Sequence, residues 1–236
     1  MFFPGFYFDQ TYILVLIGVV ISLIASAGVN RAFTQYSRVR NSRGITGAEA
    51  AERVLHSAGI YDVRIEKVAG NLSDHYDPRS KVLRLSEGVY SQPTVAAVGV
   101  ATHECGHAIQ HANGYAPLQL RSVLVPIANF GSRIAWPLIL IGLLFSRESS
   151  MIFIYLGIFA YLAAVLFQLV TLPVEFNASR RAVHMIEQTA LLQDDEIKGT
   201  KKVLRAAALT YVASALASIL QLLRIFLLAG GRRRND

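Results

Sequence analysis

Apolar residues along the chain gather into four long runs that polar stretches separate. The first run, Tyr12–Val29, contains 18 residues without a charge, which lets a helix cross about 30 Å of hydrocarbon. The later runs cover Val123–Phe145, Met151–Val174 and Val203–Ala229. The pattern predicts about four transmembrane helices, the last of which either crosses the membrane or lies in its interface.

A cleaved signal peptide is the alternative for the first run, because Ala25-Ser26-Ala27 fits a small-residue cleavage site. The segment before the run, however, holds Asp9 and neither Lys nor Arg. The run is followed by four arginines: Arg31, Arg38, Arg40 and Arg43. Such charges favour a transmembrane helix whose C-terminal flank lies in the cytoplasm. The sequence SRESS between the second and third runs is then expected on the opposite side.

The main polar region, residues 30–122, predicts a small domain with helices and strands. Thr46–Ala58 begins with a capping box and is typical of a helix. Val63–Val68 and Lys81–Leu85 alternate apolar and polar residues on either side of the turn-rich segment Asn71–Arg79. This alternation predicts a small pair of strands.

Thr94–Gln110 is rich in alanine, lacks proline and is typical of a buried helix. It contains His103-Glu104-Cys105-Gly106-His107, an HExxH motif. Residues i and i+4 lie on one face of a helix, so both imidazoles can bind one zinc ion. Zinc lowers the pKa of its bound water, and Glu104 is placed to take the proton and pass it to a leaving amine. The motif predicts a zinc-dependent hydrolase of peptide bonds, since a chance match in a buried helix is the weaker explanation.

A catalytic zinc site needs a third protein ligand and one open position. The residues downstream of the motif that could supply the ligand are His111, Glu148, Glu175, His184, Glu187 and the cluster Asp194, Asp195, Glu196. We favour Glu175, because it directly follows the third apolar run, where a carboxylate without a partner is costly. We expect Glu175 to begin a new helix that folds back against the HECGH helix.

Two further sets of residues near the motif each allow two interpretations. Arg180 and Arg181 could stabilise the oxyanion of a substrate, or they could mark the cytoplasmic end of the third span. The segment Lys81, Val82, Leu83, Arg84 and Leu85 could be an edge strand that pairs with an extended substrate, and a solvated hairpin is equally compatible with it.

Four features in order resemble the YugP-like family of neutral zinc metallopeptidases and, more distantly, the HtpX-type membrane gluzincins. They are the first apolar run and the sequences LSDHYDPRSKVLRLSEGVY, ATHECGHAIQ and PVEFNASRRA. The resemblance covers nearly the whole chain. It implies that His103, His107 and Glu175 bind zinc and that Glu104 is the general base. Ser179 stands where the HtpX-type pattern has an aspartate, which leaves the partner of the zinc-binding histidines open.

Composition supports a membrane protein with an aqueous part, since 53% of the 236 residues are hydrophobic and 17% are charged. The net charge of +7 is explained by positive charges beside the spans. Nucleic acid is not an expected partner, because no basic patch is interleaved with aromatic residues on a soluble fold. The single cysteine, Cys105, excludes an intramolecular disulfide framework and is expected to serve packing.

Together these patterns predict an α+β membrane protein, in which a small zincin-like domain is combined with about four transmembrane helices. The expected parts are an N-terminal transmembrane helix (1–29), the zincin-like domain (30–122), a transmembrane helical hairpin (123–174), a helix supplying the third zinc ligand (175–202), and a transmembrane or interfacial helix with a basic tail (203–236).

The predicted activity is zinc-dependent endopeptidase cleavage of membrane or membrane-proximal proteins. The active site is expected at the cytoplasmic face of the cell membrane, with the lipid bilayer and a protein or peptide substrate as partners; the need for an accessory membrane subunit stays open. A non-proteolytic zinc-binding scaffold or regulator is the alternative, but binding alone has no need of Glu104. A metal transporter or sensor is a further alternative, yet the only charged residues inside the later apolar runs are Arg133, Arg205 and Arg224, and these repel cations.

Overall fold

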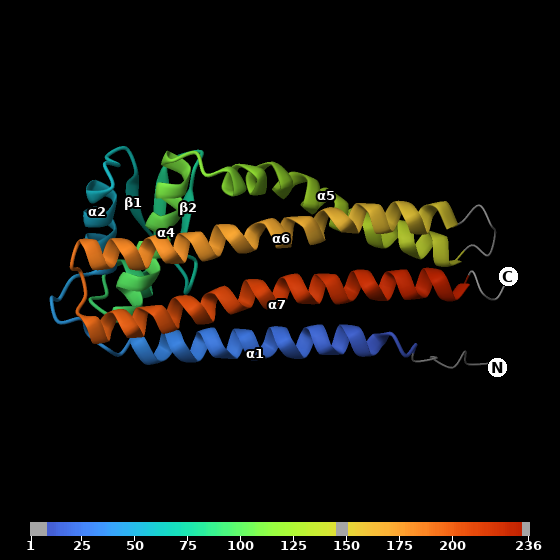
Figure 1. Cartoon of the computed structure of the whole chain (residues 1–236), viewed down its shortest axis with the longest axis horizontal. Coiled ribbons are helices and arrows are strands. Elements are labelled where there is room, and N and C mark those ends of the chain that lie inside the picture. Colours follow the sequence, from blue (N-terminus) through green and yellow to red (C-terminus); the bar gives the residue numbers. More distant parts are fainter. Residues whose placement is uncertain (1–8, 145–150, 233–236) are drawn as a thin grey trace. The chain divides into compact units, whose positions relative to one another are not determined.

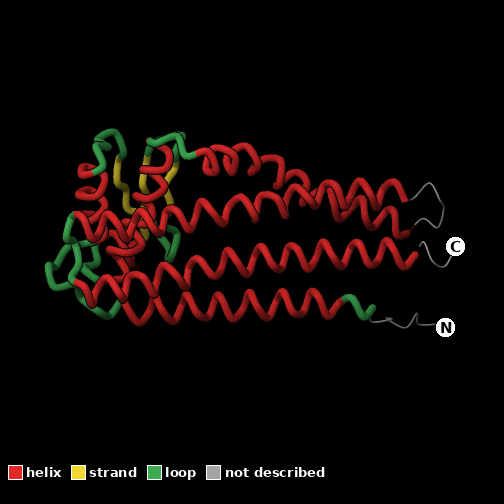
Figure 2. Tube along the Cα trace, in the orientation of Figure 1, coloured by secondary structure: helices red, strands yellow, loops and turns green. Residues whose placement is uncertain are grey.

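The computed structural model describes residues 9–144 and 151–232, which are mostly helical with a small three-stranded sheet (Figures 1 and 2). The chain divides into two compact units. The first, the helical unit, takes its described residues from Met1–Ile24, Arg121–Val170 and Val212–Asp236. The second, the mixed unit, comprises Ala25–Leu120 and Thr171–Tyr211. Each unit is therefore assembled from segments that are distant in the sequence.

Within the described residues, four helices are long and apolar enough to cross a membrane, as the four apolar runs predict. Large apolar side chains of the helical unit are exposed, among them Leu16, Phe130 and Phe159. Exposure of such side chains is favourable in contact with lipid and unfavourable in contact with water. The four helices are α1 (Tyr12–Tyr36), α5 (Ala116–Leu144), α6 (Met151–Gln188) and α7 (Asp194–Arg232). The predicted SRESS hairpin lies outside the described residues.

The expectation of a separate helix over residues 175–202 is wrong. Helix α6 passes through Glu175 without a break and ends at Gln188, and α7 begins at Asp194. The buried residues of α6 continue at helical spacing from Val174, the last residue of the apolar run, to Glu175, Ala178 and Ala182. This buried face favours an uninterrupted helix over a break at the membrane edge.

The turn between α6 and α7 is marked by Ala190, whose φ of 48° lies in the left-handed region. Asp194, Asp195 and Glu196 then occupy the first turn of α7. Their negative charges stabilise the start of a helix.

The mixed unit contains the sheet and three short or buried helices. Helix α2 (Gly47–Ser57) begins with the predicted capping box, in which the Thr46 side chain accepts from Glu49 N. Strand β1 (Arg64–Val68) pairs in parallel with β3 (Val82–Ser86), and β2 (His75–Asp77) pairs with β3 antiparallel. Helix α3 (Glu87–Tyr90) leads into α4 (Val95–Ala112), whose N-cap is Thr94.

The interpretation of Lys81, Val82, Leu83, Arg84 and Leu85 as an edge strand is wrong. The strand order is β1-β3-β2, so β3 is the central strand of the sheet. Strand β2 comes from the segment Asn71–Arg79, which is predicted as turns, and it pairs with β3 on the side opposite to β1. This hairpin is held by Asp74, whose carboxylate accepts hydrogen bonds from Ser86 N at 2.7 Å and Ser86 Oγ at 3.0 Å. The edge strands are β1 and β2.

Candidate metal centre

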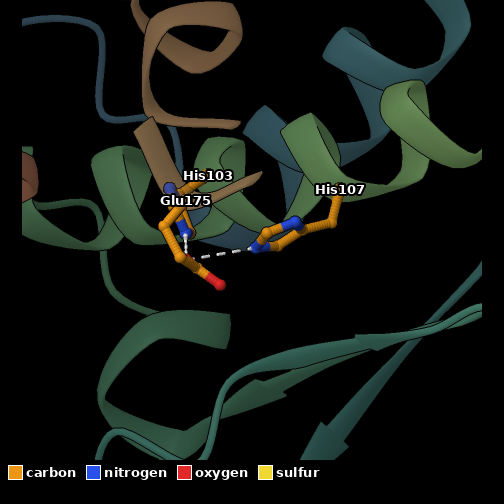
Figure 3. A group of neighbouring side chains, drawn as sticks. All are labelled: His103, His107 and Glu175. Carbon is orange, nitrogen blue, oxygen red and sulfur yellow. Dashed lines mark hydrogen bonds and ion pairs between the residues drawn. The ribbon is translucent and has the colours of Figure 1, made fainter. Parts of the chain in front are cut away.

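Two imidazoles and one carboxylate converge in the mixed unit (Figure 3). His103 and His107 come from successive turns of α4, and their ring centroids are 4.9 Å apart. Glu175 comes from α6 and is 1% exposed. Its Oε2 atom lies 3.3 Å from His103 Nε2 and 3.5 Å from His107 Nε2. The structure thus brings together the three residues that the sequence analysis selects as ligands.

The two distances that join the Glu175 carboxylate to the histidine nitrogens fit a zinc ion. Zinc binds histidine nitrogen and carboxylate oxygen at about 2.1 Å, so two ligands at a tetrahedral angle lie about 3.4 Å apart. The observed separations of 3.3 and 3.5 Å match that value. Two histidines and one glutamate are also a set found in catalytic zinc sites, where the fourth position stays open for water or substrate.

Gly106 permits the close approach of α4 and α6 at this site. A Cβ atom added at Gly106 would lie 2.5 Å from the carbonyl oxygen of Ala178, which is closer than packed atoms allow. Gly106 precedes His107 directly, and Ala178 follows Glu175 by almost one helical turn. The missing side chain therefore allows the carboxylate of α6 to reach both histidines of α4.

Gln110, one turn beyond His107 on α4, fixes the orientation of the His107 ring. Its amide nitrogen donates to the Val174 carbonyl at 2.8 Å and to Asn177 Oδ1 at 3.0 Å. The amide oxygen is left to accept from His107 Nδ1 at 3.0 Å. His107 Nδ1 therefore carries the proton, and the lone pair of Nε2 points towards Glu175.

His103 has a different partner. The Ser179 hydroxyl lies 3.1 Å from His103 Nδ1 and comes from α6, one turn after Glu175. Ser179 thus occupies the partner position that the sequence leaves open.

Gln110 and Asn177 lie outside the HExxH motif, and their roles are not predicted from the sequence. Gln110 is fully buried, and a buried amide three residues after a motif histidine is the signal that could have found it. Asn177 has no comparable signal in the sequence, because its role depends on contact with another helix.

The Glu175 carboxylate also changes the proton affinity of His107. Burial disfavours the charged imidazolium, but in that form Nε2–H donates a hydrogen bond to Glu175, and this bond and the nearby negative charges of Glu104 and Glu175 outweigh burial. The pKa of His107 is therefore raised above its usual value.

Glu104 and Cys105 lie on the same helix in different surroundings. Glu104 is 9% exposed and lines a cavity together with His103. Cys105 is fully buried, and its thiol is directed at the Ala51 carbonyl at 3.6 Å. Burial raises the pKa of this thiol well above its usual value, with the Glu104 charge as a second cause. Cys105 is therefore a packed, neutral thiol.

The two arginines after Glu175 differ in their contacts. Arg181 Nε donates to Asn177 Oδ1 at 2.8 Å, and its guanidinium lies 6.0 Å from the centroid of the Tyr115 ring. Arg180 is exposed, and no hydrogen bond or ion pair joins it to the three ligands among the described residues.

The other residues considered as a third ligand lie elsewhere in the described structure or have other partners. His111 Nδ1 is 2.9 Å from the Tyr76 hydroxyl. Glu187 accepts from Lys201 at 2.9 Å, and Glu196 accepts from Ser42 N at 2.6 Å. Asp195 pairs with Lys198, and His184 is exposed. Glu148 lies outside the described residues.

Residues 11–230 match the model of a protein family described as “putative neutral zinc metallopeptidase”. A curated relative, “Putative membrane protease YugP” of Bacillus subtilis (strain 168), is 48% identical over 216 residues. The matched region covers 91% of this chain and 95% of the relative. No solved structure matches the chain.

Proposed function

The chain belongs to the family described as “putative neutral zinc metallopeptidase”, and from this premise we propose that it is a membrane-embedded zinc-dependent endopeptidase. One observation carries the proposal. The ligand atoms of His103, His107 and Glu175 all lie within 4.8 Å of one another, and Glu104 directly follows the first of these residues. A zinc site that only binds metal has no need of an adjacent general base.

The reaction follows from the roles of these side chains. When bound, zinc supplies Lewis-acid chemistry that activates a water molecule and polarises the carbonyl of a peptide bond. Glu104 takes the proton of the attacking water and passes it to the leaving amine. Gln110 and Ser179 hold the two imidazole rings so that each can offer Nε2. Glu175 contributes negative charge from a buried position.

The four apolar helices and the name of the relative indicate a multi-pass membrane protein. We propose further that it resides in the cell membrane with the metal site on the cytoplasmic side. Support comes from the positive charges around the mixed-unit ends of the helices, in the ranges Arg31–Arg43, Arg180–Arg181 and Lys198–Lys202. Substrates would then be membrane proteins or segments close to the membrane, since Glu175 directly follows an apolar run.

Single-cysteine labelling in a Cys105→Ala background tests this orientation. Ser57 is exposed in the mixed unit, so Ser57→Cys should be protected from a membrane-impermeant reagent in intact cells and labelled after lysis. Ser149→Cys, outside the described residues, should be labelled in intact cells. The reverse pattern would invert the orientation. Labelling of Asn235→Cys in intact cells would support four spans, whereas its protection would support three.

Proteolysis is tested with the purified full-length chain in detergent, loaded with zinc and given casein or a membrane protein. A chelator should stop cleavage and added zinc should restore it. Glu104→Gln should retain zinc and lose about a hundredfold to ten-thousandfold in turnover, the contribution of a general base. Glu187→Gln is the matched control, because Glu187 is an exposed carboxylate paired with Lys201.

Two results would count against the proposal. Normal turnover by Glu104→Gln would remove Glu104 from the mechanism. Stoichiometric zinc without cleavage of any substrate would favour a zinc-binding membrane scaffold or regulator.

A further inference from the structure

A cavity of about 250 Å³ opens beside the metal site within the mixed unit. His103 and Glu104 form part of its wall. Pockets for drug-sized ligands measure about 300–1,000 Å³, so this cavity has the size for part of a ligand. A chemical group bound in this cavity would therefore belong to a molecule whose neighbouring atoms lie next to the metal ligand His103 and the general base Glu104.

The rest of the wall is mainly apolar. It is formed by one face of α7, where buried or half-buried residues recur at helical spacing, and by α1 and α4. The lining side chains are Phe33, Val100, Val203, Leu204, Ala207 and Tyr211. Such a wall favours an aliphatic or aromatic group and disfavours a charged one, because a charge would lose its hydration there.

Leu72 lies at the same cavity in an unusual backbone conformation. Its φ of 54° is in the left-handed region, and its side chain is 46% exposed. A leucine in this conformation carries a strain cost, and strained residues of this kind cluster at ligand-binding positions. An apolar group in the cavity would contact this side chain and cover part of it.

The acidic groups at the cavity restrict its occupant further. Asp74 lines it, and both of its carboxylate oxygens accept hydrogen bonds from Ser86. Glu104 provides a second carboxylate. An acidic group would therefore meet both an apolar wall and like charges.

We propose that this cavity binds one apolar side chain of a peptide substrate, adjacent to the bond that is cleaved, so that cleavage prefers aliphatic or aromatic residues at that position. The inference rests on the proposed peptidase function. The cavity walls that include His103 and Glu104 place the bound side chain beside the reacting bond.

The first experiment needs no turnover. Three zinc-chelating hydroxamates that carry a methyl, an isobutyl or a carboxymethyl group are titrated calorimetrically into the zinc-loaded full-length protein. The isobutyl compound should bind about tenfold to a hundredfold more tightly than the methyl compound, as burial of a leucine-sized group predicts. The carboxymethyl compound should bind no more tightly than the methyl compound.

Ala207→Leu fills the cavity and should remove most of the isobutyl advantage while affinity for the methyl compound is retained. Val100→Ala enlarges the cavity and should shift the preference towards a benzyl group, which keeps the inference testable if Ala207→Leu does not fold. Ala48→Leu is the matched control, since Ala48 lines another cavity, of about 540 Å³, to which none of the metal-site residues contributes. Equal affinities for methyl and isobutyl compounds, or unchanged selectivity in both cavity variants, would overturn the inference.

Peptide cleavage then separates this inference from the proposed function. Peptides that differ only in one residue beside the scissile bond are compared. Cleavage that is indifferent to an apolar, small or acidic residue on either side of the bond would overturn the cavity's role and leave the peptidase standing. Hydroxamate selectivity without cleavage of any peptide would support the cavity as an apolar subsite and overturn the peptidase.

Discussion

Helices α4 and α6 both supply metal ligands, but they do so by different physical means. In α4, His103 and His107 share a face because the helix itself places residues i and i+4 together. In α6, Glu175 reaches the same point only through packing of two helices, with 72 residues separating it from His103. The α4 contribution is local, whereas the α6 contribution depends on every contact that sets the distance between the helices.

The hydrogen-bond partners of the two histidine rings also differ in whether they come from the same helix or from the other one. His107 is held by Gln110 of its own helix, which is anchored to α6 at Val174 and Asn177. His103 is held by one hydroxyl, that of Ser179 on α6. The metal site should therefore be most sensitive to changes that remove or displace α6, and less sensitive to the loss of one ring partner.

The largest effect on zinc affinity is expected for Glu175→Ala. Two histidines alone leave the ion half coordinated by protein. The loss of zinc affinity should therefore exceed the loss of about 10–100-fold that is typical when a hydrogen-bond partner of a metal ligand is removed. Zinc titration against a competing chelator measures it, with Glu187→Ala as the control on the same helix. Full zinc affinity in Glu175→Ala would show that α6 does not complete the site.

Gly106→Ala tests the packing that delivers Glu175 without altering a ligand. The added Cβ would meet the Ala178 carbonyl oxygen at 2.5 Å, so α6 must move away from α4. Zinc affinity should fall by at least about tenfold, and the free energy of unfolding by about 1–3 kcal/mol. Gly28→Ala is the control, because a Cβ there meets nothing within 4 Å. Wild-type zinc binding by Gly106→Ala would contradict the role of this close approach.

Removal of the ring partners should have smaller and unequal effects. Gln110→Met keeps the side-chain length but loses all three hydrogen bonds, and zinc affinity should fall about 10–100-fold. Ser179→Ala loses one hydrogen bond, and its loss of zinc affinity should be about tenfold or less. A larger loss in Ser179→Ala than in Gln110→Met would reverse the ranking of the two histidines.

The smallest expected effect is a shift in pH dependence. Zinc binds the neutral imidazole, so protons compete with it. Because the pKa of His107 is raised, zinc affinity should begin to fall at a pH above the ordinary histidine value of 6.5 as the pH is lowered. Glu175→Gln removes the negative charge, so the decline in its residual affinity should begin at lower pH. Zinc titrations between about pH 5.5 and 8 compare the two proteins, and identical profiles would exclude the charge of Glu175 as the cause.

The sequence by itself determined the features that depend on neighbouring residues. Four apolar runs sufficed for four candidate spans, since span length is set by the thickness of hydrocarbon. The capping box of α2 followed from side chains within one turn. The HExxH spacing placed His103 and His107 on one face, because the helical repeat alone fixes that relation.

Only the tertiary structure decided the features that depend on distant contacts. Alternation of apolar and polar residues cannot tell an edge strand from a central one, so the position of β3 required β2 to be seen beside it. The continuous course of α6, the approach at Gly106, the Gln110–Asn177 link and the cavity beside Glu104 all arise where separate segments pack together. Periodicity in one segment carries no information about which segment will cover it, and for that reason these contacts could not be derived from local pattern alone.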